Sequence, residues 1–174
     1  LLPREAALER FPQDDRIELP RHVLMPGLIN MHTHSPMSLL RGYADDLALD
    51  AWLKEHIWPA EQRWVSPAFV RDGTALAMVE MLRGGQTCFN EMYFFPEVTA
   101  EEAREIGMRA CLGLLVLDFP SAWADGPDSY IQRGLELRER YAAEETLHTW
   151  LAPHAPYTVG DRSLTRLVDI AEEH

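Results

Sequence analysis

The chain has 174 residues, of which 47% are hydrophobic and 25% charged, so it is long enough and apolar enough for one globular domain with its own core. Its formal net charge of -12 at pH 7 argues against nucleic acid or an anionic membrane surface as the main partner, because both require clustered lysine and arginine. No apolar run approaches the length of a membrane span, and the two cysteines, Cys88 and Cys111, are expected to be reduced core thiols of a cytoplasmic protein.

Residues 1–25 have a mixed character and are expected to form an N-terminal appendage. Short strands are predicted there at 16–19 and 22–25. The chain begins at Leu1 without a methionine and ends inside an expected helix, so we expect it to be a piece of a longer protein.

From Pro26 onward, strands and helices alternate. Four strands are expected, at 28–34, 86–92, 109–117 and 147–152. Ser66 and Pro67 predict the start of the first long helix, and Gly84 its end. A capping box at 99–102 predicts the start of a helix that ends near Gly107.

Two further helices complete the alternation. One carries apolar and small residues at helical spacing over 130–141. The other is capped by Asp161 and has an apolar stripe made of Leu164, Leu167, Val168 and Ala171.

Four strand–helix units in succession predict a parallel α/β sheet. Two architectures fit this pattern, a doubly wound open sheet and half of an eight-fold barrel. The first strand–helix turn lacks the glycine-rich phosphate loop, which weakens the dinucleotide-binding version of the open sheet.

The first strand ends in two histidines, His32 and His34. Side chains alternate along a strand, so these two imidazoles are expected on the same face. Together they can chelate one divalent ion, and imidazole suits zinc, iron and other late first-row metals. The alternative is a wet face with two unrelated polar residues, but the apolar run before His32 favours the metal.

The segment at 41–61, after the first strand, is too long and too aromatic for a simple connector. It is interpreted as a lid over the metal, or as an insert whose tryptophans pack on the rim.

Polar residues also end the other strands. His154 ends the fourth strand and fits either a third metal ligand or a substrate contact. Glu91 and Asp118 also end strands, and are interpreted as supports for the site or as acids at helix starts.

Several motifs together resemble one family. The strand PGLINMHTH at 26–34 resembles the first barrel strand of the amidohydrolase superfamily. The segments LLRGYADDL at 39–47, IWPAE at 57–61 and PHAPYT at 153–158 resemble, more narrowly, the 5'-methylthioadenosine/S-adenosylhomocysteine deaminases, which are relatives of the triazine hydrolases and guanine deaminases. The resemblance runs from about Pro26 to the end of the chain.

This resemblance implies a TIM-type (β/α)8 barrel, of which residues 26–174 hold roughly the first four βα units. Residues 1–25 would be the remnant of an N-terminal β-sandwich domain. His32 and His34 would be ligands of a single zinc ion, with iron or another divalent ion as the alternative. Glu61 would bind the ribose hydroxyls of a purine nucleoside, and His154 would contact the substrate.

The implied reaction is hydrolytic deamination of an adenosine thioether such as 5'-methylthioadenosine or S-adenosylhomocysteine, or of adenosine. The remaining ligands and proton shuttles would lie in a C-terminal half of the same protein, and a homo-oligomer is expected. The alternatives are an amidohydrolase that acts on guanine, a triazine or another amino-heterocycle, and a non-catalytic half-barrel scaffold with no metal at His32 and His34.

Overall fold

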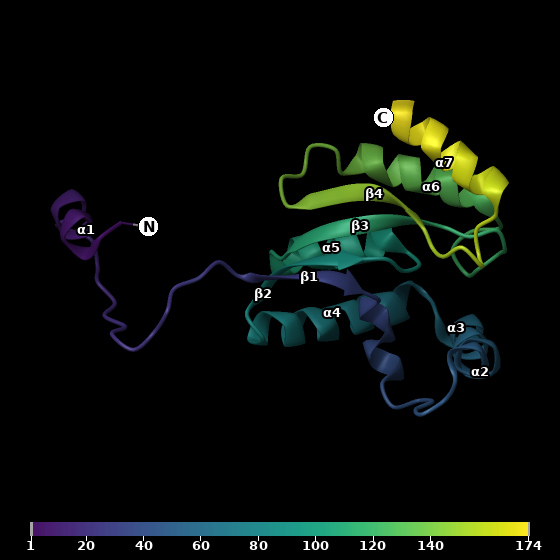
Figure 1. Ribbon diagram of the computed structural model, residues 1–174, viewed down its shortest axis with the longest axis horizontal. Helices are drawn as coiled ribbons and strands as arrows, with labels where there is room; N and C mark the ends of the chain where they lie inside the picture. The colour runs from purple at the N-terminus through teal and green to yellow at the C-terminus, as the bar shows by residue number, and fades with distance from the viewer. Residues whose placement is uncertain (1, 174) are drawn as a thin grey trace.

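The computed structural model describes residues 2–173 and contains one parallel sheet (Figure 1). Its strands are β1 (Leu28–Thr33), β2 (Gln86–Glu91), β3 (Arg109–Val116) and β4 (Leu147–Pro153), hydrogen-bonded in the order β1-β2-β3-β4. A doubly wound sheet reverses its strand order at a switch point, whereas a barrel adds each strand beside the previous one. The observed order therefore confirms the barrel alternative, with four βα units present.

The main helices cover one face of this sheet. They are α4 (Pro67–Arg83), α5 (Pro96–Ile106), α6 (Pro127–Arg140) and α7 (Asp161–Glu173). The central core lies between β2–β4 and the first three of these helices, where Met78 and Leu137 join Phe89 and Leu112. The helix α4 begins as predicted, because the Ser66 hydroxyl accepts a hydrogen bond of 3.2 Å from the Phe69 backbone N–H.

Two helix predictions need correction. The helix α5 starts at Pro96, so Thr99 lies inside its first turn and is not a cap. Thr99 is instead buried beside Thr74, with the hydroxyl oxygens 3.5 Å apart. Only Leu167 of the predicted α7 stripe lies in the core, and Val168 is 57% exposed, because the described chain has no strand beyond β4 to cover that side.

The N-terminal segment also differs from the prediction. It contains helix α1 (Arg4–Arg10), and residues 16–19 and 22–25 are not strands. Figure 1 shows this segment leading away from the sheet. Ile17 is 85% and Val23 88% exposed, so these stretches have no partner strand within the described residues to supply the hydrogen bonds of a sheet.

The insert between β1 and α4 is helical over much of its length. The 3-10 helix η1 (Ser35–Leu40) comes first, followed by α2 (Leu49–Ala51), the π-helical turn η2 (Trp52–Ile57) and α3 (Trp58–Trp64) as one continuous run. Pro59 lies in this run and has no N–H to donate to the previous turn, which explains why the helix widens just before it.

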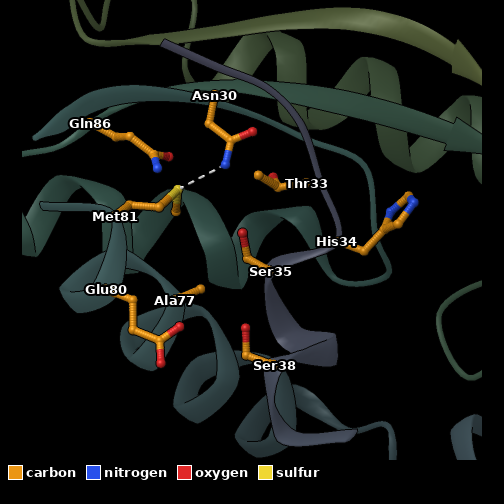
Figure 2. Close-up of a pocket in the computed structure, with 9 residues that line it drawn as sticks. All are labelled: Asn30, Thr33, His34, Ser35, Ser38, Ala77, Glu80, Met81 and Gln86. Atoms are coloured by element: carbon orange, nitrogen blue, oxygen red, sulfur yellow. Dashed lines mark hydrogen bonds between the residues drawn. The ribbon is translucent and has the colours of Figure 1, made fainter. Parts of the chain in front are cut away.

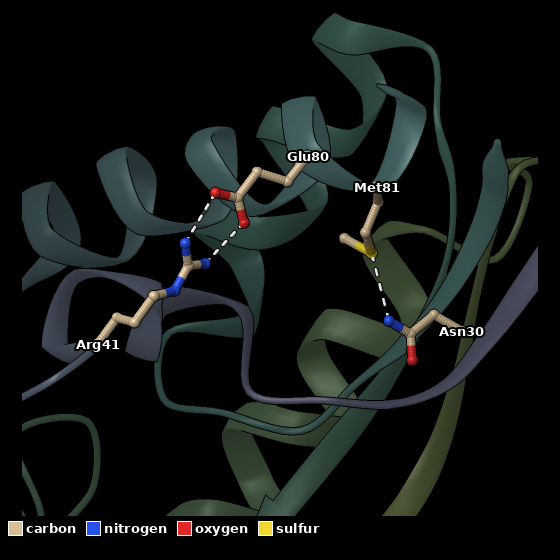
Figure 3. A network of polar contacts seen from close by, with 4 residues as sticks. All are labelled: Asn30, Arg41, Glu80 and Met81. Carbon is tan, nitrogen blue, oxygen red and sulfur yellow. Dashed lines mark hydrogen bonds and ion pairs between the residues drawn. The ribbon is translucent and has the colours of Figure 1, made fainter. Parts of the chain in front are cut away.

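Two contacts fix the start of this insert against α4. Arg41 donates two hydrogen bonds, of 2.9 and 2.6 Å, to the carboxylate of Glu80 (Figure 3). Gly73 of α4 packs directly on the backbone of Pro36 in η1. No helix among residues 2–173 combines the length and hydropathy needed to span a bilayer.

Candidate active site

The carboxyl end of β1 brings His32 and His34 together. The pairing of β1 with β2 is irregular between Asn30 and Thr33, directly beside these histidines. Their Nε2 atoms lie 3.2 Å apart, and the two rings meet edge to face with centroids 5.0 Å apart.

A backbone carbonyl fixes the orientation of His34. Its Nδ1 lies 2.7 Å from the carbonyl oxygen of Met92, which can only accept a hydrogen bond, so Nδ1 carries the proton. In the tautomer with its proton on Nδ1, Nε2 of His34 presents a lone pair beside Nε2 of His32. Metal-binding histidines typically have this arrangement, with the second ring nitrogen held by a carbonyl or carboxylate.

This geometry fits a shared metal ion. Two Zn–N bonds of about 2.0–2.1 Å at a tetrahedral angle place their nitrogens about 3.3 Å apart. The described residues contain no cluster of three or more potential metal-binding side chains, so this part of the chain offers a pair of donors rather than a closed site.

A separate cavity of about 350 Å³ lies between β1, η1 and α4. Asn30, Ser35 and Met81 line it together with His34, but the His34 ring points away from the other lining side chains (Figure 2). The imidazole pair and this cavity are therefore different places in the fold.

Glu61 approaches the histidine pair from helix α3. Its Oε1 accepts a hydrogen bond of 2.6 Å from the hydroxyl of Tyr93, in the loop that follows β2. Burial raises the pKa of the Glu61 carboxyl, and the Tyr93 hydrogen bond and the nearby His34 oppose that rise. Burial and the neighbouring Glu61 carboxylate also raise the pKa of Tyr93, so its hydroxyl stays a donor.

His154 lies just after β4, on the same side of the sheet. Its Nδ1 is 2.9 Å from Oγ1 of Thr158, and that hydroxyl donates to the carbonyl of Ala155 at 3.1 Å. Thr158 therefore accepts from Nδ1–H, which leaves Nε2 of His154 as an acceptor. Burial, and then the proximity of His34, lower the pKa of His154, so its ring is neutral near pH 7.

The two acids without an assigned role have different environments. Glu91 is only 2% exposed, and its Oε2 accepts hydrogen bonds from the residues on either side of His34. Asp118 caps the start of α7 from a neighbouring loop, because it accepts from the backbone N–H of Gly160 and the hydroxyl of Ser163, each at 2.6 Å.

The interpretation that the tryptophans of the insert pack on the rim has one direct contact in its support. Trp58 of α3 packs on Phe119 of the loop after β3, with ring centroids 6.1 Å apart. The insert is therefore joined to the rim beyond the third strand, and Glu61 lies in the same helix.

Sequence reasoning missed Tyr93 and the Met92 carbonyl. The identity of a residue does not show which donor its backbone carbonyl will bind, so the role of the Met92 carbonyl could not be predicted. Tyr93 is one residue beyond the expected end of the second strand, and its position next to that edge was the available signal.

Comparisons with known proteins give the family of the chain. The family model described as the amidohydrolase family matches residues 23–174. A protein of Saccharophagus degradans named 5-methylthioadenosine/S-adenosylhomocysteine deaminase is 51% identical over 173 residues, which are 99% of this chain and 39% of that protein. The chain thus spans about two-fifths of the length of that relative.

Solved structures show the same fold. An adenosine deaminase from Xanthomonas campestris with bound zinc has 51% identity and a TM-score of 0.84, over 86% of this chain and 34% of that one. The E. coli guanine deaminase has 26% identity and a TM-score of 0.73, over 86% of this chain and 36% of that one.

Proposed function

Because the chain belongs to the amidohydrolase family, we propose that its parent protein hydrolytically deaminates an adenosine-type nucleoside. The preferred substrates are adenosine thioethers such as 5'-methylthioadenosine and S-adenosylhomocysteine, with adenosine as a further candidate. The observation that carries this proposal is the placement of Glu61, held by Tyr93, beside the convergent His32 and His34.

His32 and His34 would hold the metal through their Nε2 atoms. Zinc is the first candidate, in keeping with the zinc in the Xanthomonas campestris structure, and iron or another divalent ion would suit the same imidazoles. When bound, such an ion supplies Lewis acidity and makes a water molecule nucleophilic near neutral pH.

The residues of this chain would bind and orient the nucleoside. A carboxylate accepts two hydrogen bonds, so Glu61 suits the neighbouring hydroxyls of a ribose. His154 offers Nε2 as an acceptor at the same edge of the sheet and would contact the substrate. We propose that the remaining metal ligands and the proton shuttles come from the C-terminal half of the protein.

The overall reaction replaces one C–N bond by a C–O bond. Water adds to the ring carbon that bears the exocyclic amine, a proton passes to the amine, and ammonia leaves to give the inosine analogue. A neutral Tyr93 keeps one oxygen of Glu61 occupied, which directs the remaining acceptor positions of that carboxylate toward a ligand.

The competing substrates are free bases such as guanine, or triazines. The identities favour the nucleoside, because two relatives named for adenosine-type substrates are each 51% identical whereas the guanine deaminase is 26% identical. A free base also has no ribose for Glu61 to bind.

Replacement of Glu61 tests this proposal. In the full-length protein, Glu61→Ala is expected to raise KM for 5'-methylthioadenosine by about 10-fold or more, since hydrogen bonds to a charged group contribute about 1.5–3 kcal/mol. Glu55→Ala, an exposed acid of the same insert, is the matched control and should change nothing. Unchanged nucleoside turnover in Glu61→Ala would contradict the nucleoside assignment.

The scaffold alternative is tested separately. It predicts that full-length protein binds no zinc, and that His32→Ala and His34→Ala alter nothing measurable. We expect instead that either substitution lowers the zinc content from about one ion per subunit and abolishes turnover.

A further inference from the structure

Three consecutive residues at the end of β2, Glu91–Met92–Tyr93, contact both parts of the candidate site. We propose that this tripeptide is a positioning element that holds the metal ligand His34 and the substrate-binding Glu61 in one frame. The proposal rests on the function proposed above for His34 and Glu61.

Glu91 supports the backbone on both sides of His34. Its Oε2 accepts 2.7 Å from the backbone N–H of Ser35 and 3.0 Å from the hydroxyl of Thr33. Because these residues flank His34 directly, the carboxylate fixes the turn from which the imidazole projects.

Glu91 is a buried acid whose two oxygens have different surroundings. Glu91 is 2% exposed, and its Oε1 has no hydrogen-bond partner among residues 2–173. A buried polar oxygen is normally hydrogen-bonded, so Oε1 is available to a group that the described residues do not supply. A divalent cation held nearby by His32 and His34 would interact favourably with this carboxyl group, and this connects Glu91 to metal binding as well as to the packing.

Met92 acts on His34 itself. Its carbonyl accepts the Nδ1 proton at 2.7 Å, which sets both the tautomer and the rotation of the ring. The next residue then reaches the lid, because the Tyr93 hydroxyl donates to Glu61 at 2.6 Å. Tyr93 is 5% exposed, so the ring that carries this hydroxyl is held firmly by its neighbours.

The separation of these roles makes the proposal testable. Tyr93 should act through Glu61 and therefore on nucleoside binding, whereas Glu91 should act through His34 and therefore on metal binding. A tripeptide that only stabilises the fold would affect both properties together, in proportion to the stability lost.

The experiment compares two conservative variants of the full-length protein with two controls. Tyr93→Phe removes only a hydroxyl, and Glu91→Gln keeps the size of the side chain while it removes the charge. Tyr141→Phe alters another tyrosine that is 5% exposed, at the end of α6, and Glu97→Gln alters a half-buried acid that bonds to Trp123. Zinc affinity is measured by competition with a colorimetric chelator, and KM and kcat with 5'-methylthioadenosine.

We expect Glu91→Gln to lower zinc affinity by about 10- to 100-fold, as is typical for groups that orient a metal ligand. Tyr93→Phe should raise KM about 10-fold with zinc affinity unchanged, and this effect should vanish in a Glu61→Ala background, because the two residues act as one unit. Both controls should match the wild type in both measurements.

Three results would overturn the proposal. The first is a zinc affinity in Glu91→Gln equal to that of Glu97→Gln. The second is a KM in Tyr93→Phe equal to that of Tyr141→Phe. The third is an increase in KM on Tyr93→Phe that has the same size when Glu61 is already alanine. If the wild-type protein binds zinc but deaminates no adenosine-type nucleoside, the proposed function fails, while the zinc comparison still decides the role of Glu91.

Discussion

Gly73 is where helix α4 touches the backbone that follows His34, and its replacement tests how tightly the site depends on that contact. A Cβ atom on Gly73 would lie 2.5 Å from the carbonyl oxygen and 2.7 Å from the Cα of Pro36. Both obstacles are backbone atoms of η1, which cannot rotate away as the end of a side chain can.

Two effects of Gly73→Ala oppose each other. Alanine in place of glycine inside a helix stabilises it by about 1 kcal/mol. Overpacking of a tight contact costs about 1–3 kcal/mol, and a backbone obstacle places this case at the upper end. We therefore expect a net destabilisation of about 1–2 kcal/mol, together with weaker zinc binding, because η1 must move away from α4 and carries Ser35 with it.

Gly134→Ala in α6 is the matched control. Its new Cβ would meet Leu114 Cβ at 3.1 Å, so a shift of a few tenths of an ångström relieves the contact, far less than at Gly73. Here the gain in helix propensity should offset the crowding, to within about 0.5 kcal/mol. Denaturant unfolding of both full-length variants, with zinc affinity measured in parallel, checks the pair. Equal stabilities for Gly73→Ala and Gly134→Ala would refute the reasoning.

Two further predictions concern the loops that frame the site. Hydrogen bonds from Ser163 and Gly160 hold the pKa of Asp118 below its usual value of 3.8, so the folded state binds this proton less tightly than the unfolded state. Its small contribution to stability is therefore complete above about pH 4 and lost as the pH falls further, and Asp118→Asn should flatten this part of a plot of unfolding free energy against pH. Trp123 donates its indole N–H to both oxygens of Glu97, at 3.2 and 3.1 Å. Trp123→Phe should cost about 1–3 kcal/mol in denaturant unfolding, because Glu97 loses its donor; an unchanged midpoint would show that this bond does not stabilise the loop.

Local signals predicted most of the framework. Ser66, Pro67 and Gly84 marked α4 because caps act through neighbouring residues alone. The convergence of His32 and His34 followed from the alternation of side chains along a strand.

The misses depended on partners distant in the sequence. Thr99 has a good capping pattern, but its burial against Thr74 and the start of the helix at Pro96 are set by packing. The N-terminal stretches at 16–19 and 22–25 have strand-like composition, yet a strand forms only where a neighbour supplies hydrogen bonds. Tyr93 meets Glu61 across 32 positions of chain, a contact that no local pattern contains.

The wide turn η2 has a consequence for how this insert tolerates change. Each residue of an α-helix turns the chain by about 100°, and a π turn takes up one extra residue by widening locally. Loss of one residue inside η2 would therefore restore regular winding with little effect on Glu61, whereas loss of one residue from α3 before Glu61 would turn that side chain about a quarter of a turn away from Tyr93. Natural variants of this insert that retain the acid should therefore vary in length at η2 and keep the spacing between Trp58 and Glu61 constant.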